Sequence, residues 1–333
     1  MRCVYDTIPP LGPKQDAAML QVVSFNIGGA RGMRPAPHDH HKLATDTFTT
    51  LKQVINPRQP TIIALQESGR AVHHDRCRDV GWKLTQFLGE SYIAAFAPEV
   101  TMCAHPHPNL WDRPAYRDMR AAAEGNAIVT NLPLEAWSWG SYPDFGACHG
   151  AHTWARQTTI SRATLYSSGN RDTQPRNLMV ASLRYRGVPL YFLNTHLGVL
   201  IGEDRHDMSY ERSRTASQMR QAQVNEILHV IEELKAADRS NEAPERAILL
   251  AGDFNAQPDA PEMEALQRHF RLLSPENPPS QQWTHQQYRI LIDHILLQDP
   301  SGQFSVISCH IQSSLPFDDL TDHRPLVGIL ALA

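Results

Sequence analysis

Apolar segments of this chain end repeatedly in carboxylate, amide and imidazole side chains. Thr61–Leu65 and Ala247–Ala251 are apolar runs of strand length, and an acidic residue follows each of them within two positions. A buried strand has no reason of its own to end in charge, because burying an unpaired charge is costly. Six such polar clusters are spread over the chain: Ser24–Asn26, Gln66–Ser68, Asn194–Leu197, Gly252–Asn255, Ile292–His294 and Thr321–His323. Their recurrence indicates that folding gathers these groups at one shared site.

The spacing of apolar residues predicts many strands and few helices, with the helices falling between strands. Predicted strands cover residues 21–27, 61–65, 92–97, 127–130, 158–166, 178–185, 190–194, 247–251, 290–297, 304–311 and 326–330. Predicted helices cover residues 43–55, 80–88, 210–236 and 261–270. This pattern favours an α/β fold in which two packed β-sheets are covered by helices on their outer faces.

The length of 333 residues is within reach of one large α/β domain. We expect residues 19–333 to form that single domain, preceded by a flexible extension over residues 1–18. Residues 98–124 lack periodicity and are interpreted as a surface insertion. No linker divides the chain, because polar clusters lie on both sides of its proline-rich segment at residues 275–279.

Composition limits the class of partner and compartment. The formal net charge is −4, so no global positive field attracts polyanions, although a bound metal ion can supply local positive charge. The five cysteines are odd in number and scattered, which favours reduced thiols over a zinc ribbon or a disulfide framework. Residues 1–20 lack the apolar core of a signal peptide, and no apolar run has the length of a membrane span. We therefore expect a cytoplasmic protein, with non-classical secretion left open.

The Gly252–Asn255 cluster follows a buried strand and brings a carboxylate and an amide to the sheet edge. Asp253 and Asn255 are two residues apart, so they lie on one side of an extended chain. Asp253 is suited to accept a proton from an attacking water, and Asn255 to hydrogen-bond phosphoryl oxygens as charge builds there. The alternative interpretation is a turn that caps a helix beginning near Pro261.

The last two clusters supply a carboxylate and an imidazole that suit one another. Asp293 interrupts an apolar strand, where an unpaired carboxylate is costly. We predict that His323 is its partner, in a dyad in which Asp293 fixes the tautomer of the imidazole. Asp322 is then a candidate metal carboxylate. His294 points to the opposite face of a regular strand, so a structural role is predicted for it.

The remaining clusters provide oxygen ligands and groups that bind phosphate. Glu67 is the first choice for a magnesium ligand, and Asn26 either ligates through its amide oxygen or orients Glu67. His196 is suited to clamp a non-bridging phosphate oxygen. Asn194, in the same cluster, and Arg162, beside a predicted strand, are candidate substrate-binding residues. Each of these residues also has an ordinary structural or solvent-exposed interpretation.

The ordered set of these motifs resembles the endonuclease/exonuclease/phosphatase superfamily, the group that contains pancreatic deoxyribonuclease. The residues that carry the resemblance are Asn26, Glu67, Asn194–His196, Gly252–Asn255, Ile292–Asp293 and Asp322–His323. Gly125–Leu134 also resembles the family's Gly-x-Ala-Ile segment, and Arg220 with Gln223 resembles its Arg-x-x-Gln. The likeness runs from about residue 21 to residue 330. Two departures are His294, where many members carry an aromatic residue, and a long charged segment over residues 198–212.

The resemblance implies a four-layer α/β sandwich of two mostly antiparallel sheets and a phosphohydrolase that uses a divalent metal. It implies that Glu67 holds magnesium, or manganese in its place, with Asn26 and Asp322 beside it. The catalytic roles that it implies are water activation by Asp253, phosphate binding by Asn255, support of His323 by Asp293, and contact of His196 with the scissile phosphate.

Three functions remain open at this point. The leading interpretation is a magnesium-dependent phosphodiesterase, and within that class a nuclease. The second is a hydrolase directed at phospholipids or phosphoinositides, although Gln287–Asp293 lacks the Pro-Ala-Trp-Cys-Asp-Arg stretch of the inositol 5-phosphatases. The third is an inactive binding scaffold. The presence of every expected catalytic residue argues against it. The sequence leaves the substrate, the choice between endo- and exo-action, and the oligomeric state open.

Overall fold

A computed structural model describes residues 19–28, 40–56, 58–70, 80–101, 123–135, 154–160, 176–199, 203 and 210–333. Within these ranges the strands form two six-stranded sheets. The first sheet has the order β11-β12-β1-β2-β4-β3. Its strands are β1 (Met19–Asn26), β2 (Thr61–Arg70), β3 (Ile93–Thr101), β4 (Ala123–Thr130), β11 (Phe304–Ile311) and β12 (Leu326–Leu332).

The second sheet has the order β5-β6-β7-β8-β10-β9. Its strands are β5 (Ala155–Thr159), β6 (Asn177–Tyr185), β7 (Val188–His196), β8 (Ala247–Asp253), β9 (Arg271–Leu272) and β10 (Asp293–Gln298). The α-helices of the described residues are α1 (His40–Val54), α2 (Val80–Leu88), α4 (Tyr210–Ser240) and α5 (Pro261–Gln267). Two short 3-10 helices, Pro279–Gln281 and Pro316–Asp319, lie in the C-terminal third of the chain.

Each sheet has one parallel pair of strands at its centre. β1 runs parallel to β2, and β7 runs parallel to β8, whereas the other pairings are antiparallel. The chain passes through α1 between β1 and β2, and through α4 between β7 and β8. Because parallel strands end at the same edge of a sheet, the carboxyl ends of each pair lie together. This arrangement determines where the polar clusters meet.

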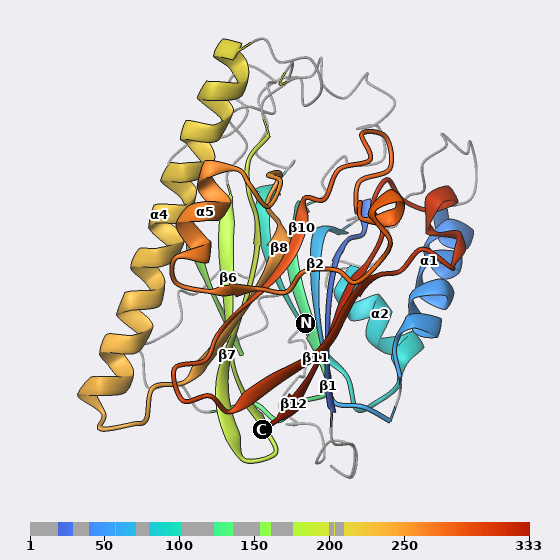
Figure 1. The fold of residues 1–333 in the computed structure, drawn as a ribbon. Coiled ribbons are helices and arrows are strands. Elements are labelled where there is room, and N and C mark those ends of the chain that lie inside the picture. The colour runs from blue at the N-terminus through green and yellow to red at the C-terminus, as the bar shows by residue number, and fades with distance from the viewer. Residues whose placement is uncertain are drawn as a thin grey trace.

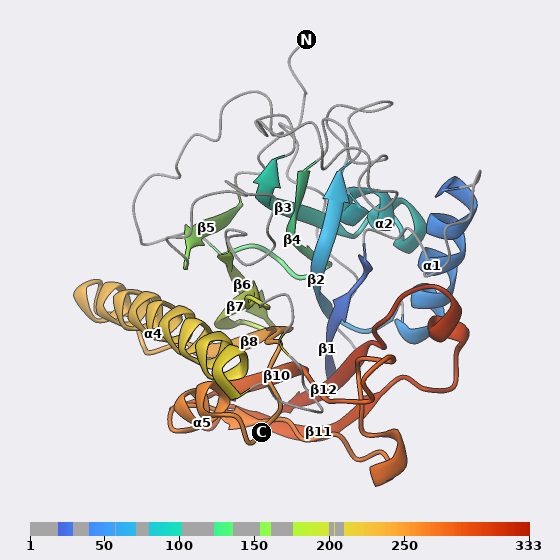
Figure 2. The same cartoon turned by 90° about the horizontal axis from the view of Figure 1, so that it is seen from above.

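The elements form four layers, with the sheets face to face and helices outside both of them (Figures 1 and 2). Three buried apolar clusters fill the three interfaces. One lies between the sheets, with Val22 and Leu249 among its members. A second packs α4 and α5 on the second sheet, and a third packs α1 and α2 on the first. Successive strand residues therefore alternate between the inner core and an outer one.

The predicted architecture, two mostly antiparallel sheets in a four-layer α/β sandwich, is confirmed. Most predicted segments match a described element; the differences lie at the ends of elements and at β9, a two-residue strand that was not predicted. The two ends of the insertion predicted for residues 98–124 lie in strands, because β3 continues to Thr101 and β4 begins at Ala123, and residues 102–122 lie outside the described ranges. Periodicity failed at Pro98 because the pairing register shifts there, and an edge strand tolerates both proline and a bulge. The strand predicted to reach residue 166 ends at Thr159, and residues 161–166 lie outside the described ranges, as does the predicted extension over residues 1–18.

None of the helices in the described ranges is both long enough and apolar enough to cross a membrane.

The predicted structural role of His294 agrees with its place on β10. Its ring packs against Phe254, with 5.6 Å between centroids, and its Nε2 lies 2.8 Å from the backbone oxygen of Ala256. The carbonyl accepts a hydrogen bond, so Nε2 carries the proton. Burial of the ring lowers the pKa of His294 to about 4, and the contact with Ala256 opposes this shift only partly.

This pKa makes stability depend on pH. Because the folded chain keeps His294 neutral while the unfolded chain protonates it near pH 6.5, stability is full above pH 6.5 and is lost progressively toward pH 4. We predict that this residue alone removes about 2 kcal/mol of unfolding free energy between pH 7.5 and pH 5. The His294→Phe variant keeps an aromatic ring but does not titrate. In urea denaturation, the difference in unfolding free energy between wild type and variant should therefore be about 2 kcal/mol smaller at pH 5 than at pH 7.5. Parallel pH profiles for the two proteins would contradict the assignment.

Candidate active site

The alternation of strand side chains explains why polar groups collect between the sheets. In β8, Ala247, Leu249 and Ala251 face the apolar core between the sheets. The next position on that face is Asp253, at the end of the strand. Ile248 and Leu250 face the helix layer instead.

The other strands of the parallel pairs follow the same rule. Inner positions are apolar along most of each strand and become polar where the strand ends. The inner series read Leu20, Val22, Ser24 and Asn26 in β1; Ile62, Ala64 and Gln66 in β2; and Leu190, Phe192, Asn194 and His196 in β7. The carboxyl ends of four strands in two facing sheets therefore converge at one end of the sandwich.

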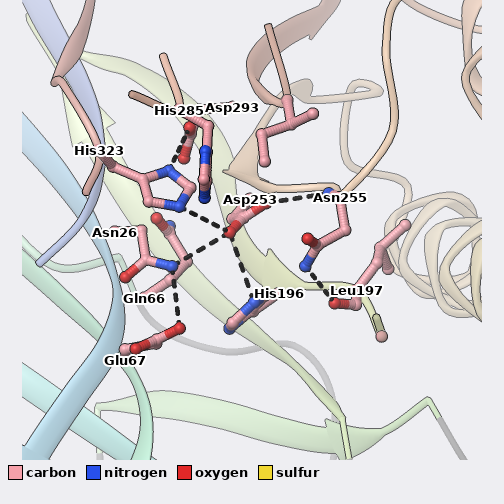
Figure 3. A network of polar contacts seen from close by, with 12 residues as sticks. Asn26, Gln66, Glu67, His196, Leu197, Asp253, Asn255, His285, Asp293 and His323 are labelled. Atoms are coloured by element: carbon pink, nitrogen blue, oxygen red, sulfur yellow. Dashed lines mark hydrogen bonds and ion pairs between the residues drawn. The ribbon is translucent and has the colours of Figure 1, made fainter. Parts of the chain in front are cut away.

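Asp253 is the centre of the polar network at this end (Figure 3). Its Oδ2 accepts a hydrogen bond of 3.1 Å from Nδ2 of Asn26, which crosses from one sheet to the other. The same oxygen lies 3.4 Å from Nε2 of His196 and 3.7 Å from Nε2 of His323. The side chain of Asp253 is almost completely buried. Three of the predicted site residues are thereby brought around the carboxylate of a fourth, Asp253.

His323 and Asp293 form the predicted dyad. Nδ1 of His323 donates a hydrogen bond of 2.7 Å to Oδ2 of Asp293, and both side chains are buried. Burial alone would lower the pKa of His323, but the carboxylates of Asp293 and Asp253 outweigh it and raise the pKa to about 10. The ring is therefore an imidazolium near neutral pH, held with Nε2 toward Asp253. A fixed cation of this kind suits the binding of a phosphoryl oxygen.

The carboxyl of Asp253 is a stronger base than an ordinary aspartate. Burial raises its pKa, and the negative charge of Asp293 raises it further. The cation of His323 and the hydrogen bonds from Asn26 and Asn255 offset this shift only in part. A carboxylate with a raised pKa accepts a proton from water more readily.

Glu67 reaches the site through a β-bulge. In a regular strand Glu67 would face the outer helix layer, because Gln66 already faces the inner one. The pairing of β2 with β4 shifts register between Leu65 and Ser68, and Glu67 has a left-handed backbone with φ of 49°. Its Oε1 accepts a hydrogen bond of 3.2 Å from Nδ2 of Asn26. The bulge turns this carboxylate toward Asn26 and the polar groups between the sheets, a common function of bulges near active sites.

The amide of Asn26 bridges Glu67 and Asp253 with its nitrogen. Its oxygen accepts the backbone N–H of Gly28 at 3.1 Å, which fixes the orientation of the amide. Of the two alternatives from the sequence, this geometry supports the orienting of Glu67 rather than ligation through the amide oxygen. Glu67 and Asp253, which come from different sheets, are neighbours because both contact one nitrogen atom.

Asn255 lies in a tight turn after β8. Its backbone N–H donates to Oδ1 of Asp253 at 2.9 Å, and its Nδ2 donates to the backbone oxygen of Leu197 at 2.9 Å. Its φ of 50° is left-handed, a conformation that asparagine tolerates better than most residues. The turn that the alternative interpretation expected is present, but the cap of α5 is Ala260, without a side-chain hydrogen bond. The turn therefore fixes Asp253 rather than starting a helix.

Asn194, a predicted substrate-binding residue, lies in hydrogen bonds between the two sheets. It is completely buried, its Oδ1 accepts from Nε2 of Gln66 at 2.8 Å, and its Nδ2 donates to the backbone oxygens of Leu65 and Ala127. All these partners belong to the opposite sheet. The geometry assigns Asn194 to joining the two sheets behind the site rather than to contact with a substrate.

His285 is a site residue that the sequence interpretation missed. Its ring lies edge-on to that of His323, with 4.9 Å between centroids, and its Nε2 is 4.0 Å from Oδ2 of Asp322. Asp322 is partly exposed beside this pair, and Oγ1 of Thr321 donates to the backbone oxygen of Asn26. His285 gave no signal because it follows no apolar strand. Arg162, the last candidate, lies outside the described residues.

The donor set fits a hard divalent cation. Carboxylates outnumber imidazoles at this end of the sandwich: Glu67, Asp253, Asp293 and Asp322 against His196, His285 and His323. Oδ1 of Asp293 is also buried without a hydrogen-bond partner among the described residues. An excess of buried negative charge with oxygen donors is the environment in which magnesium or manganese binds.

Comparisons with known proteins agree with this geometry. A sequence model of the endonuclease/exonuclease/phosphatase family matches residues 23–323. A crystal structure described as an endonuclease/exonuclease/phosphatase from Beutenbergia cavernae is similar, with 15% identity, coverage of 95% of this chain and 72% of that chain, and a TM-score of 0.60. No curated protein sequence matches.

Two further structures have the same fold at similarly low identity. The endonuclease/exonuclease/phosphatase from Bacteroides vulgatus is 15% identical, covers 95% of this chain and 100% of that chain, and has a TM-score of 0.59. The human Nocturnin catalytic domain, solved with a bound sulfate anion, is 17% identical over 95% of each chain, with a TM-score of 0.56.

Gly252 permits β7 to approach β8 beside the site. A Cβ atom on this residue would lie 2.1 Å from the backbone oxygen of Thr195. Real Cβ atoms do not come this close to another heavy atom. We predict that Gly252→Ala forces the strands apart and lowers the unfolding free energy by at least about 1–3 kcal/mol in thermal or urea denaturation. Gly328→Ala in β12 is the matched control, because its Cβ would meet a movable Leu273 methyl at 3.0 Å. Equal stability of the two variants would contradict the steric argument.

Proposed function

The chain belongs to the endonuclease/exonuclease/phosphatase family, and we propose that it is a divalent-metal-dependent phosphodiesterase that cleaves nucleic acid. The observation that carries the proposal is the convergence on one buried carboxylate. Asn26, His196 and His323 all lie within 3.7 Å of Oδ2 of Asp253, although they come from distant parts of the chain. Such a set supplies a base, a fixed cation and orienting amides, which is what hydrolysis of a phosphate ester requires.

We assign the roles from this geometry. Asp253 takes a proton from the attacking water, because its pKa is raised and Asn255 and Asn26 hold both of its oxygens. His323 donates a hydrogen bond from Nε2 to a phosphoryl oxygen, while Asp293 holds its Nδ1. His196 lies on the opposite side of Asp253 and binds a second phosphoryl oxygen (Figure 3).

Glu67 and Asp322 are the proposed ligands of the metal ion, with Asn26 orienting Glu67. When bound, such an ion polarises the phosphate and offsets charge that develops on it. The reaction replaces one P–O bond: water oxygen bonds to phosphorus in line with the leaving oxygen, and that oxygen departs with its electron pair. The proton released by water passes to Asp253.

Nucleic acid is preferred over lipid as the substrate class. In the described part of the chain, large exposed apolar side chains are confined to Met19, Leu134 and Ile307, which lie on separate elements. A lipid-directed enzyme needs a contiguous apolar surface or a basic rim. We therefore propose that the substrate is the phosphodiester of a nucleic acid. Hydrolysis of a phospholipid head group is the alternative outcome of the test.

Hydrolysis of a substrate panel tests the proposal. With magnesium present, the wild-type protein should cleave single-stranded or plasmid DNA, or RNA, and a chromogenic phosphodiester, but not sphingomyelin or phosphoinositides. Asp253→Asn and His323→Ala should each lower the rate by about 10²–10⁴-fold, because each removes a group that acts in the transition state.

Asp259→Asn, an exposed aspartate in the loop after β8, is the matched control and should retain full activity. All variants should remain folded at the assay temperature, which a thermal melt of each checks. Full activity of Asp253→Asn would contradict the assigned mechanism. Cleavage of lipid alone would contradict nucleic acid as the substrate class.

Metal dependence gives a separate test. Chelation should stop hydrolysis, and added magnesium or manganese should restore it, because the carboxylates at the site need a cation to bind a phosphate. Glu67→Gln should raise the magnesium concentration for half-maximal rate and should reduce the rise in thermal midpoint that magnesium gives the wild type. Glu90→Gln, an exposed glutamate after α2, is the control. Undiminished activity in chelator would refute the metal assignment.

A further inference from the structure

A buried ionic cluster lies behind the site, between α4, α5 and the segment after β7. We call it the Arg220 cluster, and its members are Glu203, Ser217, Arg220, Gln223 and Glu262. Arg220 is 5% exposed and donates to both oxygens of Glu203, at 2.7 and 3.0 Å, and from Nε to Glu262 at 2.6 Å. Ser217 donates to the second oxygen of Glu262 at 2.6 Å.

The Arg220 cluster holds the backbone of Gly198 from two sides. Nη1 of Arg220 donates to the oxygen of Gly198 at 3.3 Å, and Oε1 of Gln223 accepts the N–H of Gly198 at 2.9 Å. The approach is close, because a Cβ atom on Gly198 would lie 2.5 Å from Cε of Met219. The residue that follows Leu197 is therefore fixed directly against α4.

The same segment is bonded to the site on its other side. The N–H of Leu197 donates to the backbone oxygen of Asp253 at 2.9 Å, and the oxygen of Leu197 accepts from Nδ2 of Asn255 at 2.9 Å. His196 directly precedes this residue and contacts Asp253. The backbone of residues 196–198 thus connects α4 to three of the proposed site residues.

An ionic cluster is an inefficient way to stabilise a fold, because desolvation of buried charges cancels much of their attraction. Its particular advantage is geometric, since a guanidinium that donates two bonds to one carboxylate is held in a single orientation. Glu203 comes from the long charged segment in which this sequence departs from the family pattern, so the cluster is completed by a residue that the motifs do not include.

We infer that Glu203, Arg220 and Gln223 are positioning residues, which fix the backbone of residues 196–198 and through it His196 and Asn255. This inference rests on the proposed function for its effect on turnover. Arg220 and Gln223 touch the segment from the helix side, and Glu203 acts through Arg220, so we expect the three residues to affect the rate of the chemical step rather than substrate binding.

Two variants of the full-length protein test the inference. Glu203→Gln removes one charge from the Arg220 cluster, and Gln223→Met removes the acceptor of the Gly198 N–H. Each should lower kcat for the chromogenic phosphodiester about tenfold, with KM within about twofold of wild type. Hydrogen exchange of the Gly198 amide should become faster in both. Because both act through one segment, the double variant should lose less than the product of the single effects.

Glu232→Gln is the matched control, since Glu232 is on the same helix and forms only a surface ion pair with Lys235. It should leave kcat and the exchange rate unchanged. Normal kcat in Glu203→Gln and Gln223→Met, or a raised KM with normal kcat, would overturn the inference, as would an equal loss in Glu232→Gln. An inactive wild-type protein on the whole panel is a different failure, because it overturns the proposed function and this inference with it.

Discussion

The structure of the site depends on a carboxylate that is kept between two sheets with almost no access to solvent. Asp253 is 1% exposed, so its charge must be compensated by groups of the protein. The compensation comes from both sheets: an amide hydrogen bond from Asn26 in one, the backbone N–H of Asn255 in the other, and the imidazoles of His196 and His323 on either side. Removing any single partner leaves the remaining groups arranged around an under-compensated charge. The same contacts therefore fix the geometry of the site and the relative position of the sheets at this end.

The polar end of the sandwich follows from strand topology. A parallel pair in each sheet brings two carboxyl ends to one edge, and the facing of the sheets brings the two edges together. Asn194 and Gln66 then join the sheets one step further inside, where the apolar core ends. Between the open end and that core, inner strand positions change from hydrogen-bonding groups to hydrocarbon over about two residues. The polar groups are thereby gathered at one end of the sandwich, beside the apolar core between the sheets.

The sequence predicted the parts of this site that follow from strand alternation and failed where the backbone is irregular. Asp253 and Asp293 were found because a carboxylate at the end of, or inside, an apolar strand requires a partner, and His323 suited that requirement. The position of Glu67 depends on a bulge with a left-handed residue, which periodicity cannot reveal. The sequence marked Glu67 as a magnesium ligand only because it is a carboxylate at the end of an apolar strand. Asn194 fits the alternation equally well, and only its three contacts across the sheets separate a structural amide from one that binds substrate. His285 occupies an irregular turn and had no pattern to mark it.

Electrostatics connect the site to its proposed chemistry. The chain is negative overall, and four of its carboxylates, those of Glu67, Asp253, Asp293 and Asp322, lie at the end of the sandwich where a phosphate would have to bind. Without a bound cation, the negative field of these carboxylates would repel a phosphate. The imidazolium of His323 reduces this repulsion, but Asp293 and Asp253 already neutralise that cation. Attraction must then come from a further positive charge close to the carboxylates, which is the physical reason that a divalent cation suits this site better than additional basic residues would. Under the proposed function, the excess of carboxylates, costly in the metal-free protein, binds the cation through which an acidic chain binds an anionic substrate.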